Sequence, residues 1–175
     1  MPSPQKQKGN SWEREVAQYL SELWGENFMR APGSGAYIGG INTHRKQILS
    51  EGQIRTFKGD IIPGPGFSML NIECKSYKDF AFHQLLSGTT NKQLESWIAQ
   101  AMEVADTGDF TVLFMKFTRQ GTYIATPAQE TLNLPPHGTH YKSQRYGTWF
   151  FSDLKTFMEL NKDIIKELSR PSQNN

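Results

Sequence analysis

The chain has 175 residues with 19 Lys and Arg against 17 Asp and Glu, which gives a formal net charge of +2. That length suits one domain with a substantial core, and the mild positive charge permits an anionic partner without requiring one. A lone cysteine, Cys74, excludes an internal disulfide framework and a Cys-rich zinc site. With no apolar signal segment at the N-terminus and no apolar run of spanning length, we expect a soluble, cytoplasmic protein without membrane contact.

The first segment predicts a polar arm followed by an amphipathic helix. Residues 1–9 are expected to form a flexible basic arm, in which Lys8 either touches a phosphate backbone or keeps the tail solvated. Asn10 is a good N-cap with Glu13 at the capping-box position, and apolar residues recur at helical spacing up to Trp24. Glu13 lies at the edge of the apolar stripe. It either completes the capping box or reaches a metal ion or its water.

A short strand at 28–31 is predicted to lead into a glycine-rich loop at 32–36 that contains Ser34. Such a loop lets backbone N–H groups and a hydroxyl approach a phosphate, although a plain turn has the same composition. The following segment, 37–58, is long and basic. It is either a flap that contacts DNA or a solvated surface excursion. Its candidate DNA-binding residues are His44, Arg45, Lys46, Arg55 and Lys58.

The stretch from Gly59 to Lys75 carries the clearest chemistry. Two apolar runs flank a Pro/Gly turn, and a hairpin centred between Gly66 and Phe67 would place Asp60 opposite Glu73 and Ile62 opposite Asn71. Because strand side chains alternate, Glu73 and Lys75 share one face. Two carboxylates with the neighbouring Cys74 carbonyl would form a hard oxygen site for Mg²⁺, with Mn²⁺ as a substitute. The alternative is an ordinary hairpin with a charged, solvated face.

The remainder predicts a mixed sheet with helices against it. A helix at 91–105 carries Gln93 and Gln100 beside its apolar stripe, where either glutamine could contact DNA or a metal-bound water. Strands are predicted at 110–117 and 122–126, a loop at 127–147, and a last helix at 152–168 capped by Ser152. We therefore predict an α/β fold in which helices flank a central mixed β-sheet. A single domain would span 10–170, with its core at 10–126 and a tail at 171–175.

Four blocks in this order resemble the PD-(D/E)XK nuclease superfamily, and more narrowly the archaeal-type Holliday junction resolvases with their phage-encoded relatives. The blocks are Lys8–Ser11 with Glu13, Arg30–Gly35, Gly59-Asp60, and Glu73-Cys74-Lys75. The resemblance covers about residues 8–118. It implies a restriction-endonuclease-like core and a homodimer that cuts branched double-stranded DNA, in the host cytoplasm if the protein is phage-encoded.

The resemblance also implies roles for individual residues. Asp60, Glu73 and the Cys74 carbonyl would bind the metal ion, Lys75 would be the catalytic lysine, and Ser34 would lie near the scissile phosphate. Glu13 would assist the metal ion or its water. Lys8, Arg30 and Gln93 join the basic residues of 37–58 as expected DNA contacts. Gly59 departs from the pattern, since the superfamily has proline there, and 127–175 matches no part of it.

Overall fold

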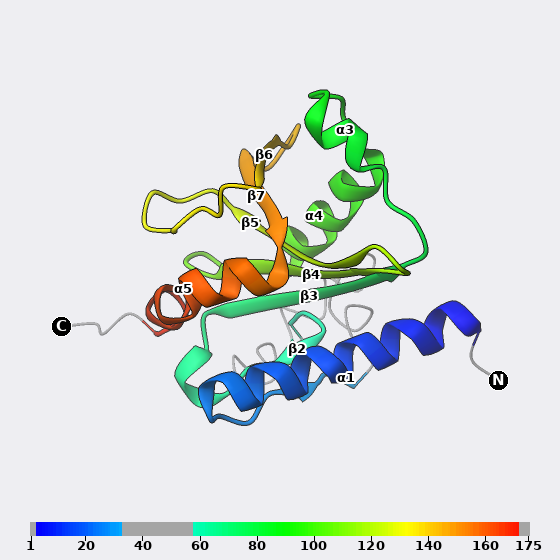
Figure 1. Cartoon of the computed structure of the whole chain (residues 1–175). Coiled ribbons are helices and arrows are strands. Elements are labelled where there is room, and N and C mark those ends of the chain that lie inside the picture. Colours follow the sequence, from blue (N-terminus) through cyan, green and yellow to red (C-terminus); the bar gives the residue numbers. More distant parts are fainter. Residues whose placement is uncertain (1–2, 33–57, 172–175) are drawn as a thin grey trace.

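The computed structural model describes residues 3–32 and 58–171 and shows a central β-sheet with helices on both faces (Figure 1). Within these ranges, the helices are α1 (Pro4–Trp24), α3 (Phe82–Leu86), α4 (Lys92–Val104) and α5 (Leu154–Leu168), with a short 3-10 helix at Pro65–Phe67. The strands are β1 (Met29–Arg30), β2 (Ile61–Ile62), β3 (Leu70–Tyr77), β4 (Phe110–Phe117), β5 (Gly121–Pro127), β6 (Thr139–Lys142) and β7 (Thr148–Asp153). Ser34, His44, Arg45, Lys46 and Arg55 lie outside the described residues.

The sheet is mixed, which confirms the predicted fold class. Its five strands follow the order β3-β4-β5-β7-β6, with β3 parallel to β4 and the other neighbours antiparallel. A separate two-stranded sheet joins β1 to β2 in antiparallel register. Strand β3 therefore forms one edge of the main sheet, and this edge carries the candidate site.

Side chains from the two faces of the sheet form two hydrophobic clusters. One cluster joins α1 and α5 to the face that includes Leu70, Ile72 and Cys74 of β3. The other joins α3 and α4 to the opposite face, and stacked aromatic rings around Phe80 and Phe117 make up much of it. Burial of both faces explains why β3 and β4 have almost no exposed positions.

The N-terminal prediction was wrong in where the first helix starts. Helix α1 begins at Pro4, so residues 4–9 are helical rather than an arm. Ser3 is the N-cap and its hydroxyl accepts the Lys6 N–H, while proline occupies the first turn, where its missing N–H costs nothing. Asn10 precedes the apolar stripe as a cap would, but it lies inside α1 and its side chain accepts a hydrogen bond from Arg30.

The predicted hairpin between the strand after Asp60 and β3 was also wrong. Ile62 pairs with Met29 of β1 and not with Asn71.

The two predicted strands 110–117 and 122–126 are confirmed as β4 and β5, and the helix at 91–105 is confirmed as α4 with Asn91 as its cap. None of the described helices is both long and apolar enough to cross a lipid bilayer.

The C-terminal third contains two strands where a loop and a helix start were predicted. Strand β6 lies within the predicted loop 127–147, and β7 runs through Ser152 to Asp153. The N-cap of α5 is Asp153, whose side chain accepts the Thr156 N–H at 2.8 Å. The three consecutive aromatic residues Trp149, Phe150 and Phe151 favour a strand. This strand runs one residue past Ser152, the serine that was predicted to cap the helix.

Candidate active site

Glu73 and Lys75 lie on the same face of β3, as their spacing predicted, and this face is turned toward α4. The Lys75 ammonium donates to Glu73 Oε1 at 2.7 Å and to Gln100 Oε1 on α4 at 2.6 Å. The alternate β3 residues Ile72 and Cys74 pack into the cluster on the opposite face. Lys75 and Glu73 are buried, and this excludes the alternative of a solvated charged hairpin.

Asp60 lies against the outer edge of β3 and is bound to it at two points. Its backbone N–H donates to Ile72 O at 2.8 Å, and its Oδ2 accepts the Cys74 N–H at 2.7 Å. These are groups that β3, as an edge strand, cannot satisfy through β4. The Asp60 carboxylate therefore caps the sheet edge directly beside Glu73.

Gly59 makes this approach possible. Its φ of +68° lies in the left-handed region, and a Cβ at this position would stand 2.5 Å from Ile72 O. A proline is excluded by the same positive φ. The glycine that departs from the superfamily pattern is thus required by the close approach of Asp60 to β3.

The Glu73 carboxyl is almost fully buried next to another acid. Burial, which has the largest effect, and the Asp60 charge together raise its pKa to about 8, although the Lys75 ammonium opposes both effects. Glu73 Oε2 is buried and accepts no hydrogen bond in the described structure. A buried carboxylate oxygen without a donor, adjacent to a second carboxylate, is the arrangement that a cation relieves.

The donor set fits a hard divalent cation. Cys74 directs its N–H to Asp60, and in an extended strand the carbonyl of the same residue points to the same edge. Asp60, Glu73 and that carbonyl would supply oxygen ligands of the type that Mg²⁺ and Mn²⁺ prefer. Among residues 3–32 and 58–171, no group of three or more His, Cys, Asp or Glu side chains lies close enough to hold a metal ion. Among the described side chains, the Asp60–Glu73 pair would supply the ligands.

Glu13 reaches the same edge from α1 but is engaged by Arg30. The Arg30 Nε donates to Glu13 Oε2, and its Nη2 donates to Asn10 Oδ1 at 2.8 Å. Asp60, Glu73 and Glu13 all raise the pKa of the Cys74 thiol, although burial has the larger effect. All three acids are therefore near Cys74, with Glu13 held by an arginine. The sequence did not reveal that Arg30, an expected DNA contact, would pair with Glu13.

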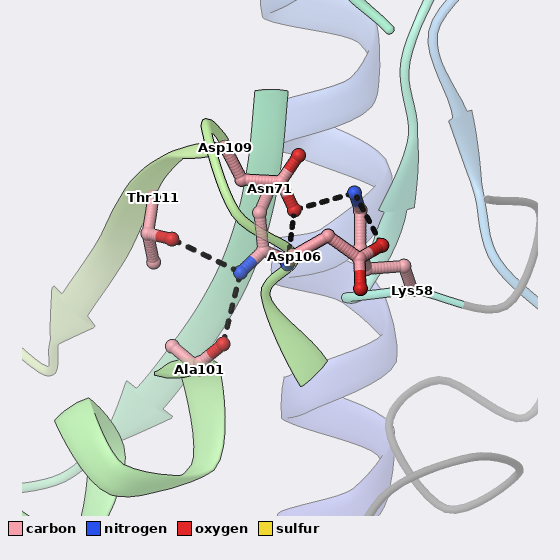
Figure 2. Close-up of polar contacts among 6 residues, drawn as sticks. All are labelled: Lys58, Asn71, Ala101, Asp106, Asp109 and Thr111. Carbon is pink, nitrogen blue, oxygen red and sulfur yellow. Dashed lines mark hydrogen bonds and ion pairs between the residues drawn. The ribbon is translucent and has the colours of Figure 1, made fainter. Parts of the chain in front are cut away.

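The other expected DNA contacts differ in exposure. Lys8 is exposed on α1 and Gln93 is partly exposed on α4, so both are accessible to a ligand. Lys58 is instead buried, with 5% of its side chain exposed, and its ammonium lies 2.5 Å from Asp109 Oδ2 (Figure 2). This position does not suit a phosphate contact. Asp109 was not identified from the sequence because nothing local marks it as the partner of a lysine 51 positions earlier.

Comparison with known proteins identifies one family. The model of the family described as "Phage putative PDDEXK endonuclease" matches residues 4–167, nearly the whole chain. No curated protein and no solved structure gives a significant match. The family match extends through the C-terminal third, which the motif resemblance did not cover.

Proposed function

The chain belongs to this family of phage PDDEXK endonucleases, and from that premise we propose that it is a Mg²⁺-dependent endonuclease that cuts four-way DNA junctions. The observation that carries the proposal is the buried Asp60–Glu73 pair with Lys75 hydrogen-bonded to Glu73. Two adjacent acids with a lysine beside one of them are suited to phosphodiester hydrolysis. A structural hairpin has no need to bury them.

Each side chain has a defined task in this proposal. Asp60 and Glu73 would hold the metal ion, which would supply Lewis-acid activation of the phosphate and of a water. Lys75 uses two of its three N–H donors on Glu73 and Gln100. Its third donor would orient the attacking water or stabilise the charge that develops on the phosphate. Gln100 fixes the lysine, and Arg30 fixes Glu13 at the edge of the site.

The junction as substrate and the homodimer as the active form rest on the resemblance to Holliday junction resolvases. A C₂ dimer offers the same site to two equivalent strands of a four-way junction. Junction cleavage would serve phage DNA recombination, repair or processing. The first alternative is the same chemistry on a flap, a mismatch or a plain duplex. The second is a non-catalytic junction-binding protein with the same fold.

One cleavage experiment separates these functions. A labelled immobile four-way junction and a linear duplex of the same arm sequence are incubated with the wild type, Glu73→Gln and Glu130→Gln, in Mg²⁺, Ca²⁺ or EDTA. Glu130 is an exposed carboxylate in the loop after β5, so Glu130→Gln is the matched control. We expect paired nicks in Mg²⁺ only, with a loss of at least about 10³-fold in Glu73→Gln.

The other outcomes lead to the alternatives. Equal cutting of the linear duplex would retain the nuclease and reject junction selectivity. Tight junction binding without product in Mg²⁺ would favour the non-catalytic protein. Cleavage that survives in Glu73→Gln would place the active centre elsewhere in the chain.

A further inference from the structure

Lys58 is the last residue before the Gly59-Asp60 turn, and its side chain is buried in an ion pair. The ammonium lies 2.5 Å from Asp109 Oδ2 and 3.7 Å from Asp106 Oδ2, with 5% of the Lys58 side chain and 1% of the Asp109 side chain exposed. Figure 2 shows the lysine directed into the loop that joins α4 to β4. We call the pair formed by Lys58 and Asp109 the Lys58–Asp109 latch.

Asp109 is a fixed anchor because its own loop holds it. Its Oδ2 also accepts the Asp106 N–H at 2.7 Å, and its backbone N–H donates to Asp106 O at 3.1 Å. The next residue, Phe110, starts β4 and pairs with Leu70 of β3. The lysine is therefore tied to the start of the same parallel strand pair that carries Glu73.

The latch is connected to Asp60 through a single glycine. Gly59 has no space for a Cβ against Ile72 O, and Asp60 then binds the β3 edge through Ile72 O and the Cys74 N–H. The three-residue turn is thus held at one end by the α4–β4 loop and at the other by β3. Release of the lysine would free one end of the turn that sets the position of the Asp60 carboxylate.

Stability alone does not account for a charged pair at this place. Burying an ammonium and a carboxylate costs desolvation energy that an apolar pair of similar volume would avoid. Asp109 Oδ1 is moreover buried without a hydrogen-bond donor in the described structure. What a charge pair provides and an apolar contact does not is a fixed relative geometry.

We propose that the Lys58–Asp109 latch positions Asp60 for metal binding, so that Lys58 and Asp109 are positioning residues of the active site. The inference rests on the proposed function, because it takes Asp60 and Glu73 as the metal ligands. Lys58 acts through Asp60 and touches neither substrate nor metal ion. Lys58, which directly precedes Gly59-Asp60, thus organises the site and does not bind DNA.

The test measures Mn²⁺ affinity of the full chain without DNA, by the electron paramagnetic resonance signal of free Mn²⁺. The variants are Lys58→Met, which keeps the length of the side chain, and Asp109→Asn, which keeps its shape. Asn161→Ala is the stability control, since Asn161 is buried on α5 and bonds Asn133 away from the site. We expect Mn²⁺ binding to weaken about 10- to 100-fold in both latch variants and to stay at the wild-type value in Asn161→Ala.

A second readout reports on Asp60 without any metal ion. The Cys74 amide should exchange with solvent faster in both latch variants than in the wild type, because its acceptor is Asp60 Oδ2. Wild-type Mn²⁺ affinity in the latch variants, with only a lower denaturation midpoint, would overturn the inference. If Lys58→Met does not fold, Asp109→Asn decides by the same comparison. Absence of Mn²⁺ binding by the wild type would instead refute the metal-dependent nuclease, and the latch with it.

Discussion

At the scale of single residues, the site depends on a conflict between burial and charge at Glu73. A carboxyl in the interior prefers to keep its proton, and a second acid beside it strengthens that preference. Lys75 opposes this effect through a direct hydrogen bond, but burial dominates and the Glu73 pKa remains near 8. Below about pH 8 the Glu73 carboxyl of the metal-free site therefore keeps a proton, which a divalent cation would displace.

The Glu73 pKa predicts how the stability of the metal-free protein changes with pH. The folded pKa of about 8 is above the ordinary value of 4.5, so the stabilisation is fully present below pH 4.5 and is lost as pH rises to 8. The free energy of unfolding, measured by urea denaturation in EDTA, should decrease across this window by at most about 1.4 kcal/mol per pH unit.

The control for this prediction is Glu73→Gln, which cannot ionise and should show a flatter profile over the same window. Mg²⁺ should stabilise the wild type more at pH 8 than at pH 5, because the cation binds the ionised carboxylate. A wild-type profile identical to that of Glu73→Gln would mean that Glu73 keeps an ordinary pKa in the folded protein.

Gln100 provides a second prediction at the residue scale. It accepts a hydrogen bond from Lys75 at 2.6 Å, so Gln100→Ala leaves the lysine with Glu73 as its one side-chain acceptor among the described residues. We expect kcat for DNA cleavage to fall about 10-fold with little change in KM, since the loss concerns orientation in the reaction. Lys75→Met should cost more, on the order of 10³-fold.

The matched control for Gln100→Ala is Glu103→Ala, one turn farther along α4 and exposed. Its kcat should equal that of the wild type. A rise in KM without a change in kcat for Gln100→Ala would instead assign the glutamine to DNA binding.

At the scale of elements, the site is built on the outer edge of β3, and Gly59 determines how close Asp60 comes to it. Gly59→Ala requires an L side chain at φ +68° and places its Cβ 2.5 Å from Ile72 O. Gly88 has the same φ of +68° but no atom within 4 Å of its Cβ position. A comparison of Gly59→Ala with Gly88→Ala therefore separates the backbone strain from the clash with β3.

We expect Gly88→Ala to lower the free energy of unfolding by about 1 to 2 kcal/mol, the cost of a left-handed residue. Gly59→Ala should cost more than Gly88→Ala and should also weaken Mn²⁺ binding, because Asp60 must move away from Cys74. Urea denaturation and Mn²⁺ titration of both variants measure the two effects. Equal losses, with wild-type Mn²⁺ affinity in both, would show that the approach of Asp60 to β3 tolerates a Cβ.

The elements around the candidate site differ in how far the sequence predicted them. The shared face of Glu73 and Lys75 and the stripe of α4 follow from local periodicity, and the structure confirms both. The pairing of β2 with β1 instead of β3 is a long-range choice, since Met29 precedes Ile62 by 33 positions. The burial of Lys58 was not predictable for the same reason: its partner Asp109 belongs to a loop that only the β3–β4 pairing brings near.

At the scale of the whole molecule, symmetric cleavage of a four-way junction would require two copies of the chain to act together. Each copy would bring its own Asp60–Glu73 pair and Lys75 at its β3 edge, so neither site would depend on the other for its chemistry. A C₂ dimer would therefore cut two strands with independent sites held at a fixed separation. Light scattering on the purified protein should accordingly give twice the mass of the 19.9 kDa chain.

Mixed dimers test this arrangement because one inactive site should stop one of two cuts. A tagged Glu73→Gln chain and an untagged wild-type chain are co-expressed, and the heterodimer is isolated through the tag and a size column. The wild-type homodimer should convert an immobile junction into two nicked duplexes. The heterodimer should nick one strand and leave a junction that still migrates as a branched species, at about half the initial nicking rate, since independent sites contribute additively. Paired nicks made by the heterodimer within one binding event would mean that a single site serves both strands, and a monomeric active enzyme would remove the symmetry argument for the junction.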